Sequence, residues 1–275
     1  MRKIQKNFLA SVFVLFVACS FYSAVFVLGV EESDDSFKVD SLFLKAVIDS
    51  EGSFDKQIKI ENRRNSLTHF EIELLDLEGL AFPEIESFDL EGNGEKKINL
   101  IFSNSDNLTE GVYVGSVIIS NEKEEKRIPV TLEIESEDII FDSNTELYPK
   151  GKIYPGDTIR FEARVHDLSQ IGSATIELTY FIKDFTGETI ISESDNMPVE
   201  GLPSFTETKS INLPNDMEEG NYVLGILLKY KNSVGTSSEF FVVEDKDLFE
   251  GVLDIENSLV YIMIAMMVMF FLFLG

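Results

Sequence analysis

Histidines and carboxylates are the side chains from which acid-base or metal chemistry could be built, and the chain holds them in very unequal numbers. It has 2 histidines against 49 aspartates and glutamates in 275 residues. His69 and His166 fall on the expected solvent faces of strands in different halves of the chain. Histidine-dependent catalysis needs a nucleophile and an orienting group beside the base, and zinc needs about three or four nitrogen or sulfur ligands. The sequence therefore predicts no catalytic triad, no zinc site and no bound cofactor of that kind.

Carboxylates are abundant enough to supply a pair of catalytic acids. A glycoside hydrolase of this type needs two carboxyl groups about 5–9 Å apart across a cleft. Small β-sandwiches rarely frame a deep cleft, and most acids of this chain fall on outward strand faces or in loops. We therefore expect a protein that is not an enzyme, with an envelope hydrolase acting on carbohydrate as the alternative.

Calcium binding is another use to which carboxylates could be put. Glu135, Glu137, Asp138 and Asp142 crowd into the expected junction between two domains. Calcium takes about six to eight oxygen ligands and would stiffen such a junction. A solvated acidic linker is the commoner explanation of a charge run. These four residues are the candidate calcium ligands, and calcium is the one cofactor considered.

Two residues are candidates for covalent modification. Asn107 begins the sequence Asn-Leu-Thr, a glycosylation sequon on an expected loop. Cys19 is the only cysteine, and the letters FVAC before and at it loosely resemble a lipobox. The apolar run continues past it to Val30, however, where a mature lipoprotein would turn polar. Cys19 is therefore interpreted as a membrane-buried thiol, and the central region is expected to fold without disulfides.

Two long apolar runs bound the central region. Residues 8–30 are uncharged and follow Arg2, Lys3 and Lys6, and residues 259–274 are also uncharged. A helix needs roughly 20 apolar residues to cross a bilayer. We predict that residues 1–30 form a signal peptide or a signal-anchor helix and that residues 258–275 form a transmembrane helix. Both would contact membrane lipid, and the basic residues would stay inside, which places the central region on the extracytoplasmic side of a cell membrane.

The second apolar run is short for a span. Its 16 residues cover roughly 24 Å of a hydrocarbon core roughly 30 Å thick, and no lysine or arginine follows. We therefore expect the chain to continue past Gly275; the alternatives are a tail trimmed by a sorting or lipid-anchoring enzyme, or a helix that ends there. The outer fragment of a longer membrane-complex subunit is a further alternative for its function.

The central region is strongly acidic. Residues 31–257 carry all 49 acidic residues and 20 of the 23 basic ones, a net charge of −29. A field of this sign repels nucleic acid and anionic lipid headgroups. The expected partner on the outer face is therefore a protein or a glycan, and not nucleic acid.

Alternation of apolar and polar residues dominates the central region, which predicts an all-β fold. In residues 125–135, EKRIPVTLEIE, the face expected to be buried comprises Ile128, Val130, Leu132 and Ile134, and the face expected to be exposed comprises Arg127, Pro129, Thr131 and Glu133. Proline in that strand favours an edge position or a bulge. Turn sequences such as EGNG, YPGD and LPND recur between short strands, as in β-sandwiches. We predict one sandwich over residues 37–136, a second over residues 137–246, and an acidic stalk over residues 247–257.

A short sequence occurs twice, as TEGVYVGSVIIS at residues 109–120 and EEGNYVLGILLK at residues 218–229. In each copy a tyrosine, Tyr113 or Tyr222, is in phase with the aliphatic residues that follow it, and one more strand follows each copy. This arrangement is typical of the penultimate strand of an immunoglobulin-type sandwich, in which the tyrosine hydroxyl bonds to nearby backbone. A pair of sugar-binding tyrosines is the less favoured interpretation.

Three segments of the first domain are distinctive: QIKIEN, KKINLIF and the final hairpin EGVYVGSVIIS to KRIPVTLEI. In these segments the domain resembles the Hydin-type and NPCBM-associated immunoglobulin-like modules of prokaryotic membrane-anchored surface proteins. The second domain looks like similar immunoglobulin-like repeats. The resemblance implies two tandem immunoglobulin-like β-sandwiches flanked by transmembrane helices, and a spacer or binding role without catalytic residues. We therefore expect a membrane-anchored, extracytoplasmic protein that serves as a structural or interaction module of the cell envelope.

Overall fold

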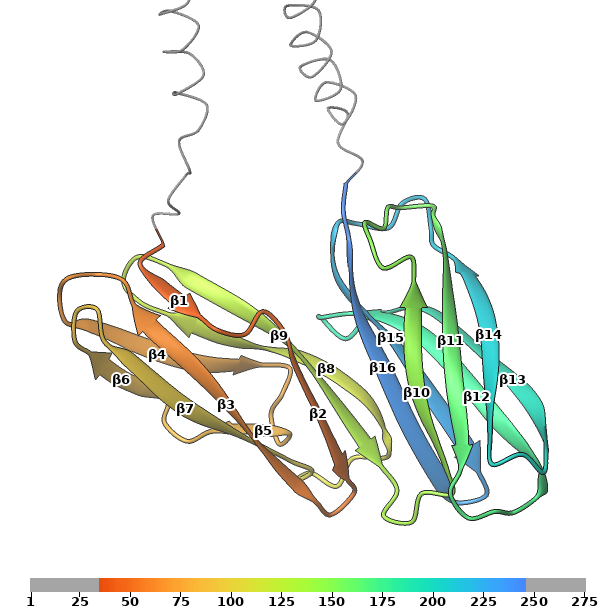
Figure 1. The fold of residues 1–275 in the computed structure, drawn as a ribbon. Helices are drawn as coiled ribbons and strands as arrows, with labels where there is room; N and C mark the ends of the chain where they lie inside the picture. Colours follow the sequence, from red (N-terminus) through yellow and green to blue (C-terminus); the bar gives the residue numbers. More distant parts are fainter. Residues whose placement is uncertain (1–34, 246–275) are drawn as a thin grey trace, which may run out of the picture. The chain divides into compact units, whose positions relative to one another are not determined.

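The computed structural model describes residues 35–245, and this part of the chain is built from strands (Figure 1). It holds 16 strands, and no helix within these residues is long and apolar enough to cross a membrane. The predicted helices at residues 1–30 and 258–275, the predicted stalk and Cys19 lie outside the described residues. The prediction of an all-β fold is confirmed for the part of the chain that is described.

The first sandwich is formed by two sheets that enclose one apolar core. Sheet A has the order β1 (Phe37–Val39), β3 (Ser53–Asn62), β7 (Glu95–Ser103), β5 (Ala81–Pro83). Sheet B has the order β2 (Leu44–Asp49), β9 (Glu125–Glu135), β8 (Gly111–Ser120), β4 (Thr68–Leu75), β6 (Ser87–Leu90). The pair β2 and β9 is parallel, whereas the other pairs are antiparallel. Only the short strands β1, β5 and β6 and the parallel β2 lie at sheet edges, which leaves little open edge for pairing with another chain.

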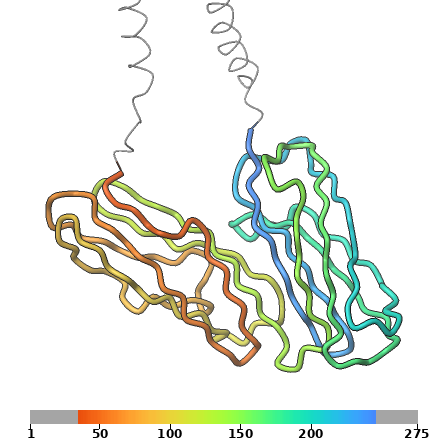
Figure 2. Tube along the Cα trace, in the orientation of Figure 1, coloured from red at the N-terminus to blue at the C-terminus, as the bar shows by residue number. Residues whose placement is uncertain are grey.

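The second sandwich repeats this plan with fewer strands. Sheet C has the order β10 (Phe141–Tyr148), β11 (Thr158–Asp167), β14 (Ser204–Asn212). Sheet D has the order β13 (Thr189–Glu200), β12 (Ser173–Asp184), β15 (Gly220–Tyr230), β16 (Ser233–Val243). The chain completes the first sandwich before it enters the second, and it crosses between them once, after β9 (Figure 2). Both sandwiches belong to one compact unit that begins at Phe37.

The two cores follow the alternation in the sequence. In β11, Ile159, Phe161, Ala163 and Val165 have no exposed surface, and the residues between them face outward or are half-buried. In β9, Ile128, Val130, Leu132 and Ile134 are likewise buried. Since a strand turns successive side chains to opposite faces, one apolar row per strand is enough to fill each core.

The repeated sequence marks the same structural element in both sandwiches. The two copies form β8 and β15, each followed by the last strand of its sandwich, β9 or β16. The hydroxyl of Tyr113 donates to the carbonyl oxygen of Thr109 at 2.7 Å, and that of Tyr222 donates to the carbonyl oxygen of Glu218 at 2.9 Å. The prediction of a penultimate strand with a backbone-bonded tyrosine is confirmed at both places.

Removing either tyrosine hydroxyl is expected to lower stability, because the carbonyl that accepts it loses its protein donor. Tyr222→Phe should cost about 1 kcal/mol, the usual net value of a hydrogen bond, and Tyr113→Phe, which is less buried, somewhat less. Thermal melting of the detergent-solubilised chain, followed by the β-sheet circular dichroism, measures both. Tyr148→Phe is the matched control: its hydroxyl bonds to Glu146 at the surface, and its melting temperature should stay near that of the parent.

Candidate functional site

The polar face of β9 is where the structure departs from the predicted pattern. Pro129, Thr131 and Glu133 were expected to face solvent, but all three are buried, with Thr131 at 0% and Glu133 at 2% exposure. The reason is that this outer face of sheet B packs against the outer face of sheet D, with β16 next to β9. Pro129 precedes Val130, where pairing with β2 begins, so that β9 is locally an edge strand there, as predicted. We call this contact between the two sandwiches the joint.

One half of the joint is apolar. Phe43, Val114, Phe185, Val223 and Phe240 form a small cluster separate from both cores. The rings of Phe43 and Phe240 stack with their centroids 4.6 Å apart, and Phe185 meets both of them edge-on. Because Phe43 and Val114 belong to the first sandwich and the others to the second, burial of this cluster holds the sandwiches together.

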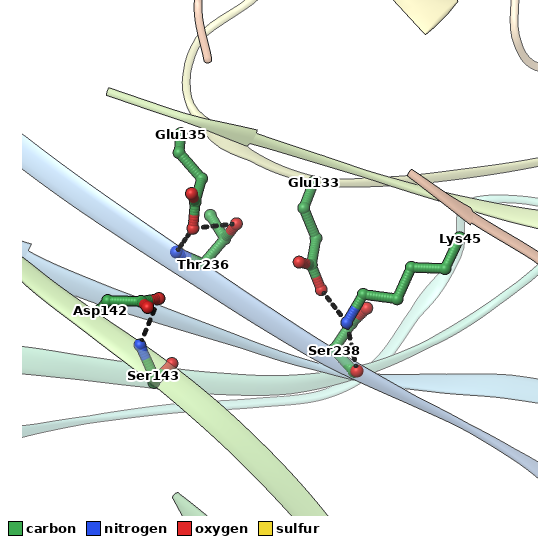
Figure 3. A network of polar contacts seen from close by, with 7 residues as sticks. All are labelled: Lys45, Glu133, Glu135, Asp142, Ser143, Thr236 and Ser238. Carbon is green, nitrogen blue, oxygen red and sulfur yellow. Dashed lines mark hydrogen bonds and ion pairs between the residues drawn. The ribbon is translucent and has the colours of Figure 1, made fainter. Parts of the chain in front are cut away.

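The other half of the joint is polar and centres on Lys45 of β2 (Figure 3). Its Nζ lies 2.8 Å from Oε1 of Glu133, whose side chain is 3% exposed, and donates to the carbonyl oxygen of Ser238 at 2.9 Å. Lys45 therefore neutralises a buried carboxylate of its own sandwich and also bonds to the backbone of the other. Removing this cation would leave Glu133 buried without an opposite charge.

Glu135, at the end of β9, makes the second polar contact across the joint (Figure 3). Its Oε1 accepts hydrogen bonds from the backbone amide of Thr236 at 2.8 Å and from the hydroxyl of the same residue at 3.2 Å. Burial raises the pKa of Glu135 above its ordinary value of 4.5, and the negative charges of Asp142 and Glu133 act in the same direction, whereas the two hydrogen bonds oppose the shift.

The linker after β9 is hydrogen-bonded to the first residues of β16. Ser136 exchanges backbone and side-chain hydrogen bonds with Val234: its amide donates to the carbonyl oxygen at 3.0 Å, and its hydroxyl accepts from the amide at 2.9 Å. The amide of Ile140 donates to the hydroxyl of Ser233 at 2.9 Å. At the apolar end of the joint, Nζ of Lys183 donates to the carbonyl oxygen of Val112 at 3.2 Å, and burial lowers the pKa of Lys183.

Several hydroxyls on the two joint faces are buried without a protein partner among the described residues. They are the hydroxyls of Ser116, Thr131 and Ser238. A buried hydroxyl without a hydrogen bond is unfavourable, so polar sites of this kind are ordinarily satisfied by internal water. The joint therefore combines an aromatic half with a polar half in which three buried hydroxyls have no protein partner among the described residues.

The four candidate calcium ligands are not gathered into one group. Glu135 points into the joint, Glu137 and Asp138 are exposed in the linker, and Oδ1 of Asp142 accepts a hydrogen bond from the amide of Ser143 at 2.7 Å. Within residues 35–245 no group of three or more His, Cys, Asp or Glu side chains could hold a metal ion. Calcium binding by these residues stays a prediction, and the arrangement gives it no geometric support.

The remaining residues singled out from the sequence lie apart from the joint. Asn107 is exposed in a turn, with a left-handed backbone at φ 50°. Nδ1 of His69 lies 2.7 Å from Oδ1 of Asp89 on the surface of the first sandwich. His166 is on β11 of the second sandwich, opposite Asp142 in the strand register. The two histidines are thus on different sandwiches, as predicted.

The sequence did not predict a cluster of polar side chains at the edge of the second sandwich where β13 and β14 lie without pairing to each other. Tyr180 of β12 is in phase with the core, but its hydroxyl forms a very short hydrogen bond with Glu193 of β13. Burial, with help from Glu193, raises the pKa of Tyr180 to about 12, so its hydroxyl stays protonated at neutral pH. Nζ of Lys209 on β14 bridges Asp195 and Glu207 at 2.8 and 3.2 Å.

These inward-pointing charges lie on β13 and β14, one edge strand of each sheet, which do not pair with each other. Inward charges on an edge strand discourage pairing with another chain. We interpret the cluster as protection of the sheet edges.

The residues of the joint were also missed as a functional group. A signal was present in β16, where Thr236 and Ser238 alternate with residues of the opposite face and Phe240 continues the same row. A row that changes from hydroxyl to phenylalanine fits neither a solvent face nor a core. It indicates a surface that meets another surface of mixed polarity.

No protein-family model matches the chain, and no curated protein matches its sequence. Among solved structures, the D0-D1 domain of Intimin is similar at 12% identity over 76% of this chain and 97% of that one, with a TM-score of 0.40. The chaperone DraB of E. coli is similar at 10% identity over 77% of this chain and 97% of that one, with a TM-score of 0.30. A PapD-like domain of human CEP192 is similar at 13% identity over 38% of this chain and 87% of that one, with a TM-score of 0.32. At these scores the fold assignment rests on the sheets described above.

Proposed function

We propose that the chain is a membrane-anchored, extracytoplasmic protein whose two immunoglobulin-like sandwiches act together as a structural or interaction module of the cell envelope, without catalysis of its own. The apolar runs at residues 8–30 and 259–274 would anchor it, with the basic residues before the first run inside. The partner would be a protein or a glycan that tolerates the acidic surface.

The joint is the observation that supports this proposal most. It connects the two sandwiches through Lys45, Glu135 and an aromatic cluster, and these contacts need no metal and no disulfide among the described residues. A module that presents a surface at a distance from a membrane needs this kind of connection. The buried polar groups of the joint hold the sandwiches to each other and do not line an open cleft where a substrate would react.

Labelling of intact cells tests the extracytoplasmic position. The chain with Cys19→Ala carries a new cysteine at an exposed site of either sandwich, Glu122→Cys or Thr206→Cys. A membrane-impermeant maleimide should label both variants in intact cells as fully as in lysed cells. Labelling that requires lysis would place the sandwiches inside the cell and refute the proposal.

A further inference from the structure

The polar half of the joint differs in composition from a permanent core. β9 contributes Thr131, Glu133 and Glu135, and β16 contributes Thr236 and Ser238. All five side chains are well solvated in water, so parting the two faces would lose less free energy here than at the aromatic half. Contacts between domains of one chain with polar faces of this kind ordinarily permit relative motion.

Parting the joint would change the surroundings of Glu135 strongly, because its carboxylate is buried in the closed joint and would be solvated in the parted one. Glu135 is 8% exposed. Its two protein donors, the amide and the hydroxyl of Thr236, both donate to the same carboxylate oxygen, Oε1. Within the described residues Glu135 forms no ion pair, whereas Glu133 on the same strand has Lys45. Closing the joint therefore takes one carboxylate out of water without a cation to balance it.

The charged groups around Glu135 do not supply that balance. On its own strand lies Glu133, already paired with Lys45 of β2, and from β10 the charge of Asp142 acts on it. The face that β16 turns toward β9 carries Thr236 and Ser238, which do not titrate. Two further charged groups make contacts in the joint: Glu110 accepts a hydrogen bond from the hydroxyl of Ser136 at 3.2 Å, and Lys183 donates one to the carbonyl oxygen of Val112.

We propose that proton uptake by Glu135 closes the joint and that proton loss loosens it, so that the two sandwiches are held together in acid and hinge relative to each other as the pH rises. The proton is taken by the carboxyl group while Thr236 continues to donate to Oε1. Water solvates the ionised carboxylate in the parted state, and internal water can follow into a joint that already has unpartnered hydroxyls.

The direction follows from the environment of the carboxyl group. Burial and two like charges raise the pKa of Glu135 in the closed joint above 4.5, the value expected when the joint is parted. A raised pKa stabilises the closed state fully below 4.5, and this stabilisation is lost as the pH rises through the raised value. The joint is therefore tightest in acid and looser at neutral pH.

Distance measurements between spin labels test this hinge in the full, detergent-solubilised chain. Cys19→Ala removes the native thiol, and labels are placed at Ser87→Cys of the first sandwich and Thr206→Cys of the second, both exposed on strands. Double electron-electron resonance should give one narrow distance distribution at pH 4.5. A second, broader component should grow as the pH rises toward 8, with loss of the narrow one.

Two substitutions assign the response to Glu135. Glu135→Gln keeps an acceptor for Thr236 but cannot ionise, so its narrow distribution should persist at every pH, whereas Glu137→Gln in the exposed linker should respond like the parent. Asp142→Asn removes one of the like charges and should move the midpoint of the response to lower pH. The proposal is overturned if the parent distribution does not change with pH, if the change survives in Glu135→Gln, or if the Asp142→Asn midpoint stays or moves upward.

Discussion

Lys45→Met is expected to destabilise the protein by about 3 kcal/mol, the lower end of what is lost when a buried charge is deprived of its partner, because Glu133 is buried while the Lys45 side chain is 36% exposed. The substitution keeps the length and apolar stem of the side chain but removes the ammonium group. Glu133, whose side chain is 3% exposed, would then be buried with no opposite charge, and the carbonyl oxygen of Ser238 would lose its donor. In thermal melting of the full chain, a loss of this size corresponds to a decrease of roughly 6–12 °C.

Two comparisons separate this loss from a general effect of removing a lysine. In Lys45→Met/Glu133→Leu the orphaned carboxylate is also gone, and most of the lost stability should return, because apolar replacements of a buried pair are often tolerated. Lys59→Met breaks the exposed pair between Lys59 and Glu95, 3.1 Å apart, and its melting temperature should hardly change. A Lys45→Met protein as stable as the parent would show that Glu133 reaches water, which contradicts the burial of this half of the joint.

The buried faces of most strands could be predicted from the sequence because one physical rule governs them. In β11 and along the apolar row of β9, a strand with one face in a core shows its phase directly in the alternation of side chains. The two tyrosines could be predicted for a related reason: Gly, Tyr and an aliphatic row occur together at Tyr113 and Tyr222, and the structure gives both hydroxyls a backbone carbonyl. Each of these signals lies within a single strand and the turn before it.

The joint could not be predicted in this way, because its signal is divided among distant segments. Thr131 and Glu133 look like solvent-facing residues until Thr236 and Ser238, about 100 residues later, are placed against them. Lys45 looks like an ordinary surface lysine in β2. Polar residues that meet other polar residues have the same pattern as polar residues that meet water, so alternation alone assigned this face to solvent.

The acidic residues at the linker show a second limit of prediction from the sequence. Glu135, Glu137 and Asp138 are close in sequence, which suggested a shared ligand. In the structure the strand ends at Glu135, whose carboxylate turns to Thr236, while the other two side chains are exposed. Closeness along the chain placed them in one region but did not determine the direction in which each points.

Gly235→Ala should be strongly destabilising, although alanine ordinarily stabilises a strand relative to glycine. A Cβ atom at Gly235 in β16 would lie 2.1 Å from the carbonyl oxygen of Phe141 and 3.2 Å from its carbonyl carbon. Both are backbone atoms, so relief requires β10 to move away from β16 at the point where the chain enters the second sandwich. That movement would displace the ring of Phe141, which is 1% exposed and packs edge-on against Tyr230 with centroids 5.5 Å apart. Overpacking of this kind costs about 3 kcal/mol, or roughly 6–12 °C in melting temperature.

Gly111→Ala at the start of β8 is the matched control, since its added Cβ would meet only the ring of Tyr113 at 3.7 Å and the carbonyl oxygen of Thr109 at 4.0 Å, both ordinary contacts. It should melt at or slightly above the temperature of the parent. The opposite signs of the two substitutions test whether β10 and β16 approach as closely as the structure has them. Equal melting temperatures for Gly235→Ala and Gly111→Ala would mean that these strands are farther apart and that the start of β10 lacks the close backbone approach to β16.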